Sequence, residues 1–311
     1  MPKSKIILQK SPRKQHIIPR TYLQHFVNQQ GRLFVYETGK SIRSSRPELE
    51  AVERDYFEHS LAGEKSNYEI EKFLSRVEDA GSVVHSKLLN RSQLTQDDIA
   101  AWSLYVAAMF IRSRRIRNEL SVRVAESAMK ECLSEDHLRD LQCDIFRTYG
   151  KLVYLSELTK IATRQAAKYE DSAYRHTQSI KYNLLNPARV LSEKRWQVVE
   201  AADGCFFSTC DAPVLSFQLV GNQVFGGCGW GIPHAHVALP LNPSMTFVAS
   251  PTNVIWNSKM DCIGTDTTNR MVALFSDRNI YADRKSEGLA VVQTKFAGSL
   301  IFGENSFKVR N

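Results

Sequence analysis

The middle of the chain carries apolar residues at intervals of three and four, which is the spacing of an amphipathic helix. Thr95 and Ser134 stand at N-cap positions before two of these segments. A short helix that begins at Pro19, over about residues 19–28, and one late helix over 267–281 show the same spacing. In the middle of the chain the pattern predicts helices over residues 47–61, 68–89, 96–133, 136–149 and 153–174.

The last third of the chain consists of short apolar runs divided by Gly, Asp, Asn and Pro, which is typical of strands and turns. An earlier run, LFVY at residues 33–36, has the same character. Between residues 201 and 250 there is no Lys or Arg, so we expect this stretch to be the most buried or the richest in sheet. The later predicted strands carry the runs WQVVEA, CFFSTC, PVLSFQLV, HVALPL and MTFVASP.

The order of these patterns predicts the fold class. Helices grouped before strands, rather than alternating with them, favour an α+β fold. We expect an N-terminal helix and strand packed on the later sheet, an all-helical middle, and a C-terminal, mainly antiparallel sheet with one late helix. Residues 1–15 are predicted to form a flexible basic arm and 16–311 a single domain. The helical part of that domain is expected at about 47–185 and the sheet-rich part at about 190–311.

Length and composition exclude several classes of protein. A chain of 311 residues that is 43% hydrophobic can bury a real core and is neither disordered nor collagenous. No apolar run approaches the ~18 to 20 residues of a membrane span, and the run Ile6–Leu8 is too short for a signal peptide. We therefore expect a cytoplasmic protein without a membrane partner. The six cysteines form no CxxC pair, so we expect reduced, mostly buried thiols and no disulfide framework.

The positive charge of the chain is concentrated at its N-terminus. The formal net charge is +8, and residues 1–46 hold ten Lys and Arg against a single Glu. Such an arm binds nucleic acid or another phosphate-rich partner by releasing counterions. The alternative is a solubilising N-terminus without a partner.

His16 and Asp211 are the candidate catalytic residues. His16 precedes the helix that begins at Pro19, and the positive end of that helix disfavours a protonated ring, which leaves the imidazole able to act as a base. Asp211 closes a predicted strand, where functional carboxylates often lie. We expect Asp211 to orient His16; the alternatives are that His16 only holds the entry of the chain and that Asp211 only caps its own turn.

Arg112 and Arg117 are candidate substrate-binding residues. Both lie on or beside the apolar face of the predicted helix around Trp102. A buried guanidinium needs a partner, either an intramolecular carboxylate or an anionic ligand such as phosphate. Both possibilities remain open from the sequence.

Asn269, at the start of the last predicted helix, is a candidate ligand-binding residue or helix cap. His234 and His236 could face one side of a strand, but packed or exposed histidines are favoured over a metal pair there. Cys205 and Cys210 lack the spacing of a zinc knuckle, so we predict no metal site. The sequence indicates no particular cofactor.

Five segments together resemble a bacterial family, the domain of unknown function 4238. The first, HIIPRTYLQHF followed by GRLFVYE, is the most specific. In this chain Arg114 stands where the family has a proline, and Cys210 stands where the family has a serine, so the resemblance implies a straighter helix and a turn without that hydroxyl. It implies no reaction. The other four segments are FIRSRRIRN, FFSTCDAPVLSF, PLNPSMTFVASP and TTNRMVALFSDRNIY, and the match spans about residues 16–283.

Two functions follow from these residues. The first is an enzyme, such as a hydrolase or nuclease, that acts on a phosphate-containing substrate, either nucleic acid or nucleotide. His16 would be its acid or base, Asp211 the orienting carboxylate, and Arg112 and Arg117 the phosphate ligands. The second is a non-catalytic binding or sensor module for nucleic acid or a small ligand, of the kind found in stress or phage-defence systems.

Overall fold

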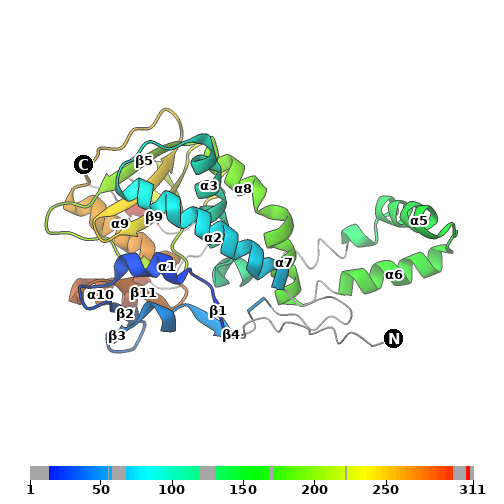
Figure 1. Cartoon of the computed structure of the whole chain (residues 1–311), viewed down its shortest axis with the longest axis horizontal. Coiled ribbons are helices and arrows are strands. Elements are labelled where there is room, and N and C mark those ends of the chain that lie inside the picture. Colours follow the sequence, from blue (N-terminus) through cyan, green and yellow to red (C-terminus); the bar gives the residue numbers. More distant parts are fainter. Residues whose placement is uncertain are drawn as a thin grey trace, which may run out of the picture.

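Strands from both ends of the chain build the sheets of this protein (Figure 1). The computed structural model describes residues 14–54, 56–57, 68–118, 130–167, 171–220, 223–296 and 306–308. Within those ranges the protein is α+β, with N-terminal strands, a helical middle and C-terminal antiparallel strands, as predicted. None of the helices described there is long and apolar enough to cross a lipid bilayer.

The largest sheet has six antiparallel strands in the order β12-β8-β7-β9-β10-β5. Its central strand β9 (Ala235–Asn242) is buried along almost its whole length. Successive residues of a strand face opposite sides of the sheet. Accordingly, Val237 and Leu239 join one hydrophobic cluster, while Ala238 between them joins another. The sheet is therefore covered on both faces. The other strands are β5 (Arg195–Glu200), β7 (Leu215–Val220), β8 (Gln223–Gly226), β10 (Met245–Ser250) and β12 (Ser306–Lys308).

Helices cover the two faces of this sheet. On one face the indole of Trp102 in α3 packs edge-on against Phe247 of β10, with 5.7 Å between ring centroids. On the other face Met271 of α9 shares a cluster with Val248 of the same strand. The first layer contains α2 (Tyr68–Leu89), α3 (Gln96–Ile111) and α8 (Leu185–Ser192), and the second contains α9 (Cys262–Phe275) and α10 (Glu287–Phe296).

The N-terminal segment joins the C-terminal part of the chain, as expected. A four-stranded antiparallel sheet has the order β3-β2-β11-β6, so early strands flank late ones. A separate pair, β1 with β4, places His16 opposite Val52. These elements are β1 (Lys14–His16), α1 (Arg20–Leu23), η1 (Gln24–Phe26), β2 (Leu33–Glu37), β3 (Arg43–Ser45), η2 (Pro47–Leu49), β4 (Val52–Arg54), β6 (Thr209–Cys210) and β11 (Asn279–Ala282).

Two helices project from the body of the protein (Figure 1). They are α5 (Glu135–Tyr149) and α6 (Leu155–Ala167), and α5 contributes no buried residue. Gly150, in the left-handed conformation with φ of 65°, ends α5. The next helix, α7 (Ser172–Asn183), returns to the body and packs against α3 and α8.

Several predicted element boundaries are wrong. The helix expected over 96–133 ends at Ile111, and the one expected over 153–174 is divided between α6 and α7. The helix expected over 47–61 is replaced by η2 and β4, because residues 52–54 pair with β1. The helix expected over 267–281 ends at Phe275, because residues 279–282 pair with β2. In each of the last two, pairing with a distant strand overrides local propensity.

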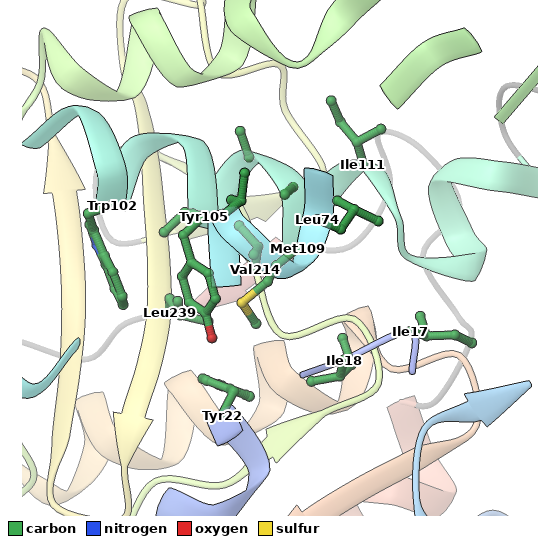
Figure 2. Close-up of a cluster of buried hydrophobic side chains, with 14 of the residues drawn as sticks. Ile17, Ile18, Tyr22, Leu74, Trp102, Tyr105, Met109, Ile111, Val214 and Leu239 are labelled. Carbon is green, nitrogen blue, oxygen red and sulfur yellow. The ribbon is translucent and has the colours of Figure 1, made fainter. Parts of the chain in front are cut away.

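The core around α1 depends on a buried tyrosine. Figure 2 shows Tyr22 below Tyr105 and Leu239, with Ile17 and Ile18 of the same segment beside it. The Tyr22 hydroxyl donates to the carbonyl of Pro240 at 2.7 Å and shares a second hydrogen bond with Thr209. The side chain of Tyr22 thereby attaches the N-terminal segment to β9 and β6.

A close helix contact explains one glycine. A Cβ atom built at Gly81 of α2 would lie 2.3 Å from Cγ of Tyr105 in α3. Only a residue without a side chain allows the two helices to approach this closely at that point.

We expect Tyr22→Phe to lower the free energy of unfolding by about 1–3 kcal/mol, because the carbonyl of Pro240 and the hydroxyl of Thr209 would each lose a buried partner. Urea unfolding monitored by circular dichroism measures this change. The matched control is Tyr154→Phe, at a side chain that is 82% exposed. That change should stay within about 0.5 kcal/mol. Equal effects of the two substitutions would contradict the assigned role of Tyr22.

Candidate functional site

Helix α3 ends where its arginine-rich segment begins. Ser113 donates to the carbonyl of Phe110 from both its backbone nitrogen and its hydroxyl, which closes the last turn. The same hydroxyl accepts from the backbone nitrogen of Ile116 and so starts a further turn. Ser113 thus ends helix α3 and begins the next helical turn. The straighter helix that the resemblance implied, from Arg114 in the place of a proline, is not formed. The break leaves Arg112 as the C-cap of α3.

Arg112 is the most deeply buried charged residue of this region, with 1% of its surface exposed. Its Nη1 atom donates to the carboxylate of Glu78 in α2. Among the described residues, its Nε and Nη2 atoms have no hydrogen-bond partner. Of the two partners that the sequence left open for Arg112, the intramolecular carboxylate is therefore present. It occupies one of the three guanidinium nitrogens.

His16 lies within electrostatic range of this ion pair. Burial is the largest effect on its ring and lowers the pKa, and the charge of Arg112 lowers the pKa further; Glu78 acts in the opposite direction. A lowered pKa favours the neutral form of the imidazole. The cause is different from the predicted one: burial and Arg112 dominate, and α1 is only four residues long.

Helix α7 brings further basic side chains to the same place. His176 contacts the carbonyl of Ile111 through Nε2 at 2.9 Å, and the charges of Arg117 and Arg112 help burial to lower its pKa to about 4. Burial is the largest effect that lowers the pKa of Arg175, and the charge of Arg117 lowers it further. Arg117 donates to the carbonyl of Tyr56 and covers the ring of the same residue at 4.6 Å. We call this group the basic site, and it consists of His16, Arg112, Arg117, Arg175 and His176.

The basic site combines the groups that anion chemistry needs. Positive charges gathered in one place repel one another, and this repulsion is relieved when an anion binds among them. The Nε and Nη2 hydrogens of a guanidinium point in the same direction and match two oxygens of a phosphate or carboxylate. A neutral imidazole at its side can take a proton.

Asp211 belongs to a neighbouring cluster. Its carboxylate accepts hydrogen bonds from the backbone nitrogens of residues 277, 278 and 279, at 2.8, 2.9 and 3.2 Å. Arg114 lies 3.7 Å away and also pairs with Glu53 of β4. Within the described part of the chain, no hydrogen bond joins Asp211 to His16. Asp211 therefore caps the turn between α9 and β11, rather than its own turn, and the orienting contact expected with His16 is not made in this arrangement.

The carboxylate of Asp277 is close to Asp211. Burial and the charge of Asp211 raise the pKa of Asp277 to about 7, although Arg114 and a hydrogen bond from the backbone nitrogen of Arg115 favour the charged form. Burial also raises the pKa of Asp211, against its three hydrogen bonds and Arg114. The cluster thus holds two acids that resist ionisation.

Asn269 lies in the middle of α9 and not at its start, because the helix begins at Cys262 with Asp261 as its N-cap. The Oδ1 atom of Asn269 accepts from the backbone nitrogen and hydroxyl of Ser208, both at 2.8 Å. Its Nδ2 atom donates to the carbonyl of Phe206 at 2.8 Å. Asn269 therefore holds the loop before β6 and also lines a cavity of about 220 Å³.

The two histidines near β9 are not a pair. His236 is buried, stacks on Phe217 and bonds the hydroxyl of Ser250 at 2.9 Å, whereas His234 is exposed. Among the residues that the structure describes, no three His, Cys, Asp or Glu side chains are grouped so that they could hold a metal ion.

Sequence reasoning missed three residues of this region. Glu78, Arg175 and His176 lie on α2 and α7, far from the arginine-rich segment in the chain. The only available signal was the run YRHT at residues 174–177, which puts two basic residues among positions that are buried in the structure. Such a run on a polar helix does not by itself indicate a site.

Comparison with known proteins gives one result. The model of the family described as "Protein of unknown function (DUF4238)" matches residues 14–286, which is most of the chain. No curated protein and no solved structure matches.

The raised pKa of Asp277 predicts a pH dependence of stability. Between pH 3.8, the ordinary value, and about 7 the folded state holds a proton that the unfolded state has lost. Stability from this group is therefore present at low pH and is lost as the pH rises through this window. In Asp277→Asn this pH-dependent loss should be absent. The free energies of unfolding at the two ends of the window should therefore change by at most about 4 kcal/mol more in the wild type than in the variant, at about 1.4 kcal/mol per pKa unit.

Urea unfolding of both proteins at intervals from pH 4 to pH 8 tests this prediction. The difference between the wild type and Asp277→Asn is the quantity of interest, since His85 and His176 contribute their own pH dependence to both. Asp140→Asn, at an exposed position of α5, should keep the wild-type slope. The same slope in Asp277→Asn would show that Asp277 ionises normally.

Proposed function

Because this chain belongs to the DUF4238 family, whose description provides no reaction, we propose a function from the site itself: it binds a phosphate-containing substrate at Arg112 and uses His16 as the acid or base. The observation that carries the proposal is a pair of nitrogens, Nε and Nη2, that have no partner among the described residues and belong to a guanidinium that is 1% exposed. Leaving such donors unsatisfied in the interior costs about 1–3 kcal/mol, which a bound anion would offset.

Arg112 would be the recognition residue. Glu78 holds Nη1, and this fixes the orientation of the guanidinium so that the Nε and Nη2 edge is left for the ligand. A phosphate group accepts two parallel hydrogen bonds from that edge. Arg117 and Arg175 would add positive charge, since the charge of Arg117 acts on both Arg175 and His176.

His16 would move the proton. It is half-buried and within electrostatic range of Arg112, and a ligand held by the guanidinium would have to bring its leaving oxygen or attacking water to the ring. A neutral imidazole takes a proton from water or a hydroxyl and returns it to the leaving group. Glu78 raises the pKa of His16 and would stabilise the imidazolium that forms. Asp211 would act only indirectly, through Arg114.

The substrate class that fits is a nucleotide or nucleic acid. His16 follows shortly after the basic residues 1–14 in the sequence, and these charges would add to the binding of a polyanion through counterion release. Residues 1–13 of this basic arm lie outside the part of the chain that the structure describes. The alternative, a binding or sensor module for the same ligands, needs the same arginines but no proton transfer. The role of His16 distinguishes the two.

We expect inorganic phosphate, nucleotides or short oligonucleotides to raise the melting temperature of the protein, by an amount equivalent to ~2.7 kcal/mol at 100 times the dissociation constant. Arg112→Lys should weaken this binding at least tenfold, because an ammonium keeps the charge but lacks the two-pronged edge. Arg189→Lys, at an exposed i,i+4 pair with Glu193, is the matched control and should bind like the wild type.

Two further variants make the outcome decisive. Glu78→Gln should bind phosphate as well as the wild type or better, since it removes a competing negative charge and keeps an acceptor for Nη1. Removal of residues 1–13 should weaken oligonucleotide binding and leave phosphate binding unchanged. A flat thermal response of the wild type to the whole panel would overturn the proposal.

For the enzyme, we expect His16→Gln to reduce turnover of phosphate esters about 10²–10⁴-fold while ligand binding persists. In the wild type the rate should fall as the pH drops through the lowered pKa of His16, below 6.5. His137→Gln, on the projecting helix α5, is the control. Turnover that survives His16→Gln would remove His16 from the mechanism, and binding without any turnover in the wild type would favour the sensor module.

A further inference from the structure

Cys205 and Cys262 meet although 57 residues separate them in the sequence. Their Sγ atoms are 3.0 Å apart, and both cysteines are reduced. Of the six cysteines only Cys210 is buried, so the expectation of mostly buried thiols is wrong. Cys262 is exposed and Cys205 is partly exposed, which leaves the pair open to reagents in solution.

The backbone around each cysteine is held in place. Cys205 follows a tight turn in which its nitrogen donates to the carbonyl of Ala202 at 3.0 Å and Gly204 has a φ of 77°. The nitrogen of Ala202 donates in turn to Thr265 of α9 at 3.3 Å. The sulfur contact is therefore a consequence of the fold and not of two mobile loops.

Further contacts fix the two segments on either side of the pair. The nitrogen of Met260 donates to the carbonyl of Glu200 at 2.9 Å, two residues before Cys262. On the other side Asn269 of α9 holds Ser208, as described above. Closing the sulfur distance by about 1 Å, to the ~2.0 Å of a disulfide, thus requires side-chain rotation and little movement of the backbone.

We propose that Cys205 and Cys262 form a redox-active dithiol, an oxidation site that a peroxide converts to a disulfide. Cys262 is the first nucleophile, because it is the more exposed of the two and because the contact with Cys262 raises the pKa of Cys205 and keeps that sulfur protonated. The proposal does not depend on the basic site.

The reaction balances in two steps. The sulfur of Cys262 attacks one oxygen of hydrogen peroxide, the O–O bond breaks, and a sulfenic acid and one water molecule form. The sulfur of Cys205 then attacks the sulfenic sulfur, the S–O bond breaks, and the second water leaves. Two thiols have lost two electrons and two protons, and one peroxide has become two water molecules.

The disulfide would alter a cavity. Both cysteines line the cavity of about 220 Å³ that also contains Asn269. An S–S bond would join the loop before β6 to the first turn of α9 and thereby make this wall of the cavity rigid. A ligand of that cavity would be bound differently in the two redox states.

The test treats the folded full-length protein with hydrogen peroxide and counts its thiols. We expect the titre to fall from six to four, a peptide containing Cys205 linked to one containing Cys262 by mass spectrometry, and full reversal by dithiothreitol. The oxidised protein should melt at a higher temperature than the reduced one. Cys205→Ser should stop the reaction at a sulfenic acid on Cys262, which dimedone traps.

Cys143→Ser provides the control, because Cys143 is an exposed single cysteine on α5 and its loss should leave the cross-link unchanged. Phenylarsine oxide, which bridges two neighbouring thiols, should bind the reduced wild type at one equivalent and fail to bind Cys262→Ser. Oxidation of Cys262 at the same rate as Cys143, without a link to Cys205, would overturn the proposal. A link that forms only in urea would overturn it equally.

Discussion

Burial of the central sheet on both faces is the constraint on which the rest of the structure depends. An antiparallel sheet usually needs cover on one face only, with polar residues on the other. Here β9 and β10 are apolar on both faces, so neither can reach water without a large loss of hydrophobic stabilisation. The middle helices cover one face, and α9 and α10 cover the other. The order of helices and strands along the chain follows from this requirement.

The same packing creates the basic site. Helix α3 packs on the sheet, and its C-terminus ends inside the protein, next to α2 and α7. The next residue in the chain is Arg112, and its place after the buried end of α3 forces its charged side chain into the interior. A charge in such a place needs compensation, and Glu78 compensates it only in part. Arg114 is better satisfied, since it has both Glu53 and Asp211.

The basic site and the dithiol differ in their physical character. The basic site collects charges whose repulsion is reduced by an anion, whereas the dithiol is held in contact by neutral backbone hydrogen bonds. They belong to different layers of the fold: Arg112 follows α3, and Cys262 begins α9. One can therefore be changed without the other, which makes their functions separable by experiment.

The sequence by itself determined the fold class, the positions of the longer strands of the C-terminal sheet, and the helix over 68–89, because these depend on local periodicity and composition. It also identified Arg112 as an arginine on the apolar face of a helix. Only the tertiary structure decided what surrounds it. The end of α3, the pairing of 52–54 with β1, and the approach of Glu78 and His176 to Arg112 all depend on contacts between distant segments, for which local pattern contains no information. For the same reason Asp211, a plausible partner for His16 by its strand-end position, instead holds the turn that leads into β11.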